Sequence, residues 1–258
     1  MYDIFIMKNE CLILSSYFSL NPHPNNVIDE SVVGVQQDGK VWDNDFNYIK
    51  SWYESILENN IKGVIFHDNL HFDFISKYEN ENIKFVKTEV DGYSNNDFRF
   101  FCFYDYLEKL TEAPAMVFHN DISDVVVVKN PIDLLNEFQN IDYFCCKDSI
   151  PLSKFPYIQA HQHYNWNDSV KFMLNDGFWE LINMGVIGGD FTNMKEFYRC
   201  FVEVRSNMKD YHFNADMWVL QYLLRSKLSE KSLLIGDPVC SEFKKYQNDR
   251  KDVYFIHK

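Results

Sequence analysis

The amino-acid sequence predicts an α/β fold in which helices flank a mixed, mostly parallel sheet. Short apolar runs alternate with longer amphipathic stretches through most of the 258 residues, which is typical of successive βα units. Hydrophobic residues make up 46% of the chain and charged residues 24%, so a disordered or fibrous protein is excluded. A chain of this length can bury roughly three quarters of its unfolded surface. Because no repeat, low-complexity tract or linker interrupts it, we expect one domain over residues 1–258.

The first half of the chain alternates strands with helices. Apolar residues at helical spacing indicate a helix that begins at Asn44 or Asp45 and ends near residues 59–60. A second helix is expected over residues 97–110, with one of the polar residues 94–96 as its N-cap. The predicted strands of this half are residues 11–16, 63–66, 83–86 and 115–119.

The second half continues the alternation around one long irregular segment. Residues 150–176 contain two Pro, two His and many Asn, so we expect a long surface loop there. Ordered loops of this length in compact domains are often functional. The other predicted elements are extended chain at 125–128, a helix starting at Asn130-Pro131, strands at 143–146 and 185–189, helices from Asn193 and from Asn214 to Leu224, and a final strand near Tyr254.

The charge balance limits the possible partners. The chain has 25 Lys and Arg against 38 Asp and Glu, a formal net charge of −13. An acidic surface repels phosphate backbones, so we expect no nucleic-acid partner. An anionic ligand would have to be bound by a local cation or a metal ion.

The sequence also predicts a compartment. No stretch reaches the roughly 20 apolar residues of a membrane-spanning helix, and the first ten residues lack a basic start followed by an apolar run. The six Cys show no CxxC or zinc-type spacing, so a disulfide framework is not expected. We expect a cytoplasmic protein of a bacterium, or of a virus in its host cell.

The strongest candidate for chemistry follows the strand at residues 115–119. Asp121, Ser123 and Asp124 lie in the loop after this strand, and the carboxyl ends of parallel strands are where α/β sheets bind ligands. Two carboxylates there can hold a divalent cation, which would neutralise a diphosphate. The alternative is that these residues only form a turn stabilised by their own side chains.

Two further candidates lie later in the chain. Gly185, Gly188 and Gly189 belong to a glycine-rich strand that allows a ligand to approach the backbone closely, and Asn183 can hydrogen-bond hydroxyls. The alternative is a strand that ends in a tight turn. Asp216 opens a helix, where the helix dipole favours an acidic residue without any function.

The chain end and the irregular segment contribute the remaining candidates. A final strand would carry His257 and Lys258 to a fixed place, as a metal ligand and a phosphate-binding cation, whereas the alternative is a solvated tail. His161 and His163 lie two residues apart, and with Trp166 they are candidates for contacts with a sugar or an acceptor, the alternative being ordinary loop packing.

Taken in order, these segments resemble the glycosyltransferases of GT-A fold, in particular the galactosyltransferase-like and glycogenin-like nucleotide-sugar transferases. The resemblance covers most of the chain, from residue 97 to residue 258. It rests on the helix segment DFRF with Arg99, the strand and acidic loop AMVFHNDISDVVVVKNP, the segment NMGVIGG, the helix-opening Asp216 and the terminal His257-Lys258. The family motif places its two carboxylates two residues apart. Here they are three apart, and Ser123 stands in the register of the second Asp.

The resemblance implies a function and a role for each motif. It implies a hexosyl- or pentosyltransferase that uses Mn²⁺ or Mg²⁺ and a nucleoside-diphosphate sugar, with a UDP-sugar ahead of a GDP-sugar, to glycosylate a glycan or another hydroxyl acceptor. Either retention or inversion of configuration remains open, and the NMGVIGG segment favours retention. The implied metal ligands are Asp121, Asp124 and His257; the implied donor-binding residues are Arg99, Asp121, Ser123, Lys244 and Lys258; the implied substrate-binding residues are Asn183, Gly185, Gly188, Gly189, His161, His163 and Trp166; and the implied catalytic residue is Asp216.

Two other functions remain compatible with the sequence. A sugar nucleotidyltransferase has a similar sheet, but it usually carries a glycine-rich basic loop after the first strand, where this chain has SSYFSLNPHP. A non-enzymatic carbohydrate-binding protein would use some of the 44 aromatic residues to stack on glycans, independently of metal or nucleotide.

Overall fold

The computed structural model describes residues 9–20, 44–90, 92–154, 180–208 and 214–258. The strands in these residues are β1 (Cys11–Tyr17), β2 (Lys62–His67), β3 (Ile83–Lys87), β4 (Met116–Asn120), β5 (Val125–Val127), β6 (Tyr143–Pro151), β7 (Glu180–Asp190), β8 (Leu233–Ile235) and β9 (Phe255–His257). The helices are α1 (Phe46–Glu58), α2 (Phe72–Tyr78), α3 (Asn95–Lys109), α4 (Asp133–Glu137), α7 (Phe191–Ser206) and α8 (Asp216–Tyr222), with a 3-10 turn at Leu152–Lys154 and a π-helical turn at Leu223–Lys227.

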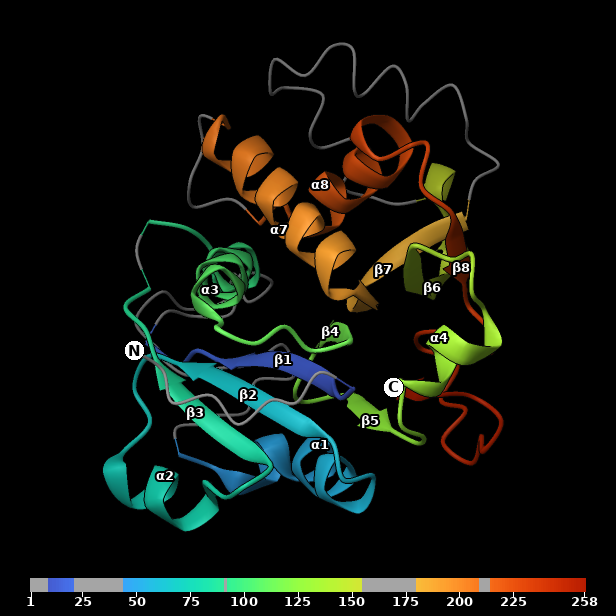
Figure 1. Cartoon of the computed structure of the whole chain (residues 1–258). Coiled ribbons are helices and arrows are strands. Elements are labelled where there is room, and N and C mark those ends of the chain that lie inside the picture. The colour runs from blue at the N-terminus through green and yellow to red at the C-terminus, as the bar shows by residue number, and fades with distance from the viewer. Residues whose placement is uncertain (1–8, 21–43, 91, 155–179, 209–213) are drawn as a thin grey trace.

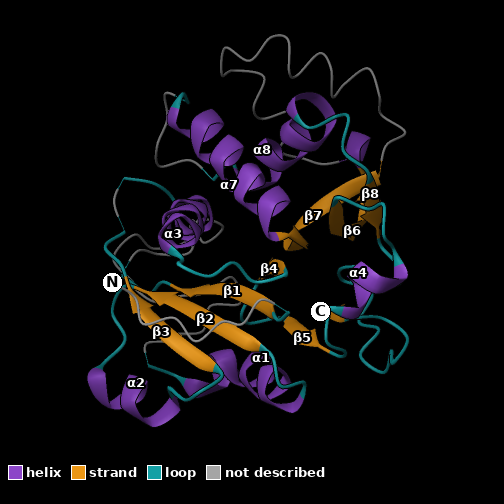
Figure 2. Cartoon of the chain, in the orientation of Figure 1, coloured by secondary structure: helices purple, strands orange, loops and turns teal. Residues whose placement is uncertain are grey.

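Seven strands form one mixed sheet in the order β3-β2-β1-β4-β7-β6-β8, and β5 pairs with β9 in a separate ribbon. The first four strands of this order are parallel, β7 lies antiparallel between β4 and β6, and β8 is parallel to β6. The predicted α/β fold with a mixed, mostly parallel sheet is therefore confirmed (Figure 2). Its parallel strands end at a common edge, which is where α/β sheets bind ligands.

Helices cover both faces of the sheet. In Figure 1, α1 and α2 lie on one face of β1, β2 and β3, and α3 and α7 lie on the other. Neighbouring residues of β1 alternate between the two resulting cores. Leu12 and Leu14 pack in the cluster that includes α3 and α7, whereas Cys11 and Ile13 pack in the cluster that includes α1. This is the two-residue period expected of a strand that is buried on both faces.

Trp52 of α1 fixes that helix to the sheet. Its side chain is fully buried, and a Cβ at Gly63 of β2 would lie 2.7 Å from its ring, so the glycine makes room for the indole. The indole Nε1 donates a hydrogen bond of 2.6 Å to Oδ1 of Asn120, the last residue of β4. One buried side chain of α1 therefore holds the point at which the acidic loop leaves the sheet.

The first two predicted helix starts are confirmed. The Asp45 carboxylate accepts a hydrogen bond of 2.9 Å from the Asn47 amide and caps α1. The Ser94 hydroxyl accepts one of 3.2 Å from the Asp97 amide and caps α3. In both cases a short polar side chain satisfies an amide that the first helical turn leaves without a partner.

The start of α7 differs from the prediction of a helix beginning at Asn193. β7 continues to Asp190, and the Asp190 carboxylate accepts a hydrogen bond of 2.7 Å from the Asn193 amide, so α7 begins directly after it. β7 also begins earlier than predicted, at Glu180, and is not confined to residues 185–189.

Asn214 does not cap α8, as the sequence had predicted. The residue at the N-cap position is Ala215, whose side chain cannot accept a hydrogen bond. The Asp97 carboxylate of α3 accepts a hydrogen bond of 3.2 Å from the Ala215 amide, and the Asp216 carboxylate accepts from the Met217 amide. The contact that positions the start of α8 therefore comes from another helix, which local sequence does not reveal.

The bounds of two further elements differ from the prediction. The helix predicted at Asn130-Pro131 begins at Asp133, because the Asn130 side chain accepts from the Ile132 amide at 3.1 Å and forms a turn first. β6 continues beyond the predicted residues 143–146 to Pro151. The short elements α2 and β8 were not predicted. Within the described part of the chain, no helix has the length and apolar character needed to cross a membrane.

We predict that His67, at the end of β2, makes stability sensitive to acid. The residue is buried, its Nδ1 accepts from the Leu70 amide at 3.3 Å, and burial together with Lys87 lowers its pKa to about 4. The unfolded chain binds a proton near the ordinary pKa of about 6.5, so stability should fall as the pH drops from about 6.5 to 4, by at most about 1.4 kcal/mol per pH unit.

His67→Asn keeps an acceptor for the Leu70 amide but removes the titrating ring. Urea unfolding across this pH range should therefore give a shallower decline for His67→Asn than for the unchanged protein. Parallel curves for the two proteins would contradict the assignment.

Candidate functional site

The acidic loop after β4 holds two partly exposed carboxylates. The side chains of Asp121 and Asp124 are 31% and 35% exposed, and Ser123 between them is exposed. The Asp121 amide donates a hydrogen bond of 2.9 Å to the Gly185 carbonyl of β7. The start of the loop is therefore tied to the strand that pairs with β4.

β9 places His257 against this loop. β5 follows the loop directly and pairs antiparallel with β9, so that Val125 lies opposite His257. The Lys258 amide donates to the Asp124 carbonyl at 3.0 Å. His257 Nε2 then lies 3.7 Å from Asp124 Oδ2 and 4.0 Å from Asp121 Oδ2.

Three observations show that these residues fit a divalent cation. One ligand atom each from Asp121, Asp124 and His257 lies within 4.8 Å of the others. His257 Nε2 and Asp124 Oδ1 are buried and make no hydrogen bond within the described structure. A Cβ at Gly185 would lie 2.2 Å from the His257 ring and 2.9 Å from Asp121 Oδ2, so only glycine leaves this space open. Two carboxylates and one imidazole can hold an ion such as Mn²⁺.

The charge states favour binding of a cation. Burial alone would raise the pKa of Asp121, but Arg99 and His257 outweigh this effect and lower it, so the carboxylate stays ionised. Burial alone would lower the pKa of His257, but Asp124 and the Cys146 thiol raise it to about 10. Without a metal ion, a proton on His257 therefore occupies the place of the cation.

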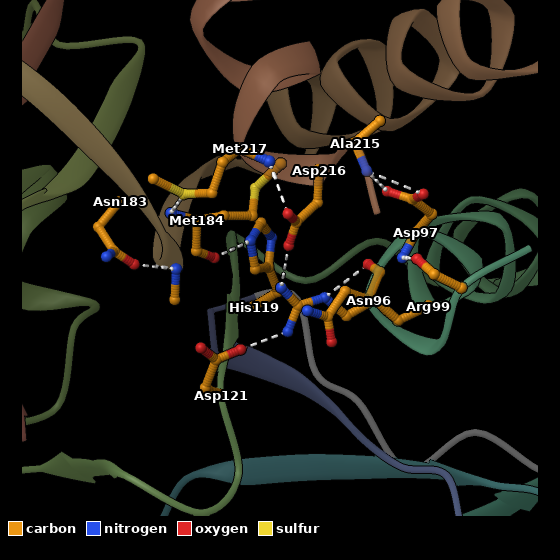
Figure 3. Close-up of polar contacts among 12 residues, drawn as sticks. Asn96, Asp97, Arg99, His119, Asp121, Asn183, Met184, Ala215, Asp216 and Met217 are labelled. Carbon is orange, nitrogen blue, oxygen red and sulfur yellow. Dashed lines mark hydrogen bonds and ion pairs between the residues drawn. The ribbon is translucent and has the colours of Figure 1, made fainter. Parts of the chain in front are cut away.

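Arg99 of α3 joins the acidic loop to α8 (Figure 3). One guanidinium nitrogen pairs with Asp121 and the other lies 3.2 Å from Asp216 Oδ2. The side chain is 7% exposed, and its Nε donates to the Asn96 carbonyl at 3.1 Å. Arg99 therefore orients both carboxylates.

Asp216 lies at the start of α8 and is buried. Its second oxygen accepts from the Met217 amide at 2.6 Å. Burial raises the pKa of Asp216; Arg99 opposes this effect and Asp97 adds to it, so that the pKa is about 7. Asp97 itself pairs with the buried Arg205 at 2.9 Å, and the two acidic residues hold the start of α8 against α3.

Asn183 and Gly185 lie in the middle of β7 beside the acidic loop. Asn183 donates to Asp148 Oδ2 at 3.0 Å and accepts from the Gly185 amide at 2.7 Å. The Asn183 side chain is thus held by β6 and by its own strand. The substrate-binding role predicted for it stays a prediction.

Gly188 and Gly189 serve packing within the sheet. A Cβ at Gly188 would lie 2.3 Å from the Phe118 ring, and one at Gly189 would lie 2.4 Å from the Asp142 carbonyl oxygen. Close packing accounts for both glycines, and the substrate-binding role predicted for them stays a prediction.

The remaining predicted residues are less fully defined. Lys244 is exposed and has a positive φ of 61°. Its Nζ lies 5.0 Å from the centre of the Phe243 ring. The centres of the Phe243 and His257 rings are 4.2 Å apart. Lys258 is partly exposed beside Asp124. His161, His163 and Trp166 lie outside the described residues.

Sequence reasoning missed two residues beside the site. Tyr48 of α1 is close enough to Asp124 and Asp121 that, in addition to burial, their charges raise its pKa. His119 of β4 is fully buried, and burial lowers its pKa to about 3. Its Nε2 must carry the hydrogen, because it lies 3.0 Å from the Met184 carbonyl, which can only accept. The sequence showed only that His119 lies in a predicted strand close to Asp121. Its hydrogen-bond partners, Tyr198 and the Met184 carbonyl, come from distant segments.

We predict that Gly185→Ala removes metal binding. The new methyl group would lie 2.2 Å from the His257 ring and occupy the space between His257 and Asp121, so Mn²⁺ binding followed by electron paramagnetic resonance should be lost and the melting temperature should fall. Gly188→Ala, on the same strand, should lower the melting temperature through its comparable clash with Phe118 but keep Mn²⁺ binding. Equal Mn²⁺ affinity in Gly185→Ala and the unchanged protein would contradict the site.

Comparisons with known proteins agree with the fold. No protein-family model matches the chain, and no curated protein matches it significantly. Among solved structures, the galactosyltransferase LgtC in complex with donor and acceptor sugar analogues is similar over 95% of this chain and 86% of LgtC, with a TM-score of 0.52 and 12% identity. An active-site mutant of LgtC gives the same coverage and identity with a TM-score of 0.50.

A third structure is that of a glycosyltransferase involved in glycosylation of the major capsid of PBCV-1, with 15% identity, a TM-score of 0.45, and coverage of 96% of this chain and 94% of that one. The two LgtC structures describe one protein, and at 12% identity their similarity concerns the fold. The chain thus has the α/β fold of GT-A glycosyltransferases, as its sequence predicts.

Proposed function

We propose that this chain is a metal-dependent glycosyltransferase that transfers a sugar from a nucleoside-diphosphate sugar, a UDP-sugar in the first place, to a hydroxyl of a glycan or another acceptor. The observation that carries the proposal is the donor set of Asp121, Asp124 and His257, at the carboxyl end of β4 and in front of Gly185. The neighbouring fold of LgtC, whose structure was solved with donor and acceptor sugar analogues, supports it.

The acidic loop and β9 would hold the metal ion. Because an imidazole nitrogen completes the set, we favour Mn²⁺ over Mg²⁺, which prefers an all-oxygen environment. A bound divalent ion would act as a Lewis acid that stabilises the negative charge of the diphosphate leaving group. Lys258, next to Asp124, and Lys244, whose Nζ lies over the Phe243 ring that packs against His257, would neutralise the rest of that charge.

Arg99 and Asp216 would form the catalytic side of the site. Arg99 fixes Asp121 and Asp216 relative to each other through one buried guanidinium group. Asp216 would stabilise positive charge at the anomeric carbon in a retaining reaction, or accept the acceptor's proton in an inverting one. Its pKa of about 7 suits a group that has to exchange a proton near neutral pH. We assign acceptor binding to Asn183 and to His161, His163 and Trp166.

We predict that Asp121→Asn and Asp216→Asn have different effects. Asp121→Asn removes a ligand charge, so the Mn²⁺-dependent rise in melting temperature with UDP should disappear. Asp216→Asn should keep this rise but lower sugar transfer by at least about a hundredfold, the usual loss when a general acid or base is removed. Thermal unfolding with UDP or GDP, with and without Mn²⁺, followed by a transfer assay, provides the test. If no nucleoside diphosphate raises the melting temperature in either condition, the proposal fails.

We also predict that Mn²⁺ affinity rises with pH across the neutral range. The proton on His257, whose pKa is raised to about 10, must leave before Nε2 can bind the ion, so each pH unit below about 10 should cost up to about tenfold in affinity. Titration calorimetry at pH 6, 7 and 8 in buffers of different ionisation enthalpy would count the released protons. His257→Gln should remove most of this dependence, and an unchanged slope in that variant would contradict the role of His257.

A further inference from the structure

Two buried thiols face the other nitrogen of His257. Cys146 Sγ on β6 lies 3.6 Å from His257 Nδ1, and one ligand atom each of Cys146, Cys240 and His257 lies within 4.8 Å of the others. All three residues are buried. In the described part of the chain this is one of two groups with the composition and spacing to hold a metal ion, the other being the Asp121 group.

The spacing matches neighbouring ligands of a tetrahedral ion. With a metal–sulfur distance of about 2.3 Å and a metal–nitrogen distance of about 2.0 Å, a tetrahedral angle separates S and N by about 3.5 Å, close to the 3.6 Å between Cys146 Sγ and His257 Nδ1. The Ser241 carbonyl accepts from Cys146 Sγ at 3.5 Å and is thus an oxygen atom close to this group. In the metal-free protein the same sulfur and nitrogen form a hydrogen bond.

The surrounding backbone fixes the three ligands in place. Cys146 lies in β6 of the main sheet, Cys240 forms a bridge with Phe255 of β9, and the His257 amide donates to Ser241 Oγ at 2.9 Å. The ligands therefore come from three segments held by backbone hydrogen bonds.

The charge balance of such a site suits its burial. In the metal-free protein both thiols and both His257 nitrogens carry protons, so binding of a divalent ion breaks two S–H bonds and one N–H bond, forms two metal–sulfur bonds and one metal–nitrogen bond, and releases three protons to solvent. The buried group thereby changes from one positive charge to none. An electrically neutral group avoids the cost of burying a charge. Thiolates also select soft ions such as Zn²⁺ or Cd²⁺ over Mn²⁺ and Mg²⁺.

We propose that Cys146, Cys240 and His257 Nδ1 form a second metal site, selective for a soft divalent ion, and that an ion bound there opposes the binding of a hard ion at Nε2. A neutral imidazole has one nitrogen lone pair. When Nδ1 uses it for a soft ion, Nε2 carries the hydrogen and cannot bind a second ion. His257 thus faces two sites of different chemistry, only one of which it can serve at a time.

Cd²⁺ titration of the metal-free protein tests the new site directly. Thiolate–cadmium bonds absorb in the ultraviolet, and we expect this absorption to saturate at one equivalent of Cd²⁺. Cys146→Ala and Cys240→Ala should each weaken Cd²⁺ binding by at least about tenfold and reduce the absorption. Cys145→Ala is the matched control, because Cys145 is equally buried on the opposite face of β6 and should leave the titration unchanged. Equal titrations in all four proteins would overturn the proposal.

X-ray absorption at the cadmium edge identifies the atoms that bind Cd²⁺ in the unchanged protein. This measurement does not depend on whether the variants fold. One equivalent of bound Cd²⁺ should show two sulfur neighbours and lighter atoms in its first shell. A first shell of oxygen and nitrogen alone would overturn the proposal, because it would place the ion at Asp121 and Asp124.

The antagonism between the sites rests on the proposed Mn²⁺ function and has its own measurement. Mn²⁺ binding followed by electron paramagnetic resonance should be at least about tenfold weaker in protein preloaded with Cd²⁺, and Cys240→Ala should relieve the effect. Undiminished Mn²⁺ binding in the preloaded protein would overturn the antagonism. A thiolate–cadmium band without any Mn²⁺ or nucleotide binding would contradict the proposed function and leave the soft-ion site standing.

Discussion

The candidate site depends on the buried guanidinium group of Arg99. This one side chain of α3 contacts Asp121 after β4 and Asp216 at the start of α8, which lie 95 residues apart in sequence. A second buried pair, Asp97 with Arg205, joins α3 to α7, and Asp97 also accepts a hydrogen bond from the Ala215 amide at the start of α8. Removing one partner of such a buried pair typically costs roughly 3–5 kcal/mol, because the other charge is left unsatisfied. α3 therefore determines where α7, α8 and the acidic loop lie relative to one another.

β7 provides the matching constraint on the other side of the site. It lies antiparallel between β4 and β6, and its Gly185 carbonyl accepts from the Asp121 amide. Gly185 then leaves the space in which Asp121 and His257 approach each other. A parallel strand in this position would present a different register to the acidic loop. The reversal of direction at β7 is thus part of the geometry of the site.

Local sequence predicted the elements that depend on local physics. The strand at Ala115–His119 and the helix capped by Ser94 follow from hydrophobic periodicity and a short polar side chain, and the structure has them within one or two residues. The predicted start of α8 was wrong because the contact that positions it joins the Ala215 amide to the Asp97 carboxylate, more than 100 residues away in sequence. The contact between Cys146 and His257 was equally out of reach, since it depends on how β6 and β9 meet. Cys145 and Cys146 are adjacent in the sequence, yet they lie in opposite cores.

The hydrogen bond between Trp52 and Asn120 places a tryptophan of α1 next to the residue that precedes the acidic loop. The indole is fully buried and donates to the side chain immediately before Asp121. Its emission depends on the polarity and charge of its surroundings, so an ion or a charged ligand at Asp121 acts on a chromophore that the chain already contains. We therefore expect binding at the site to change the emission of Trp52 through the contact that orients the end of β4.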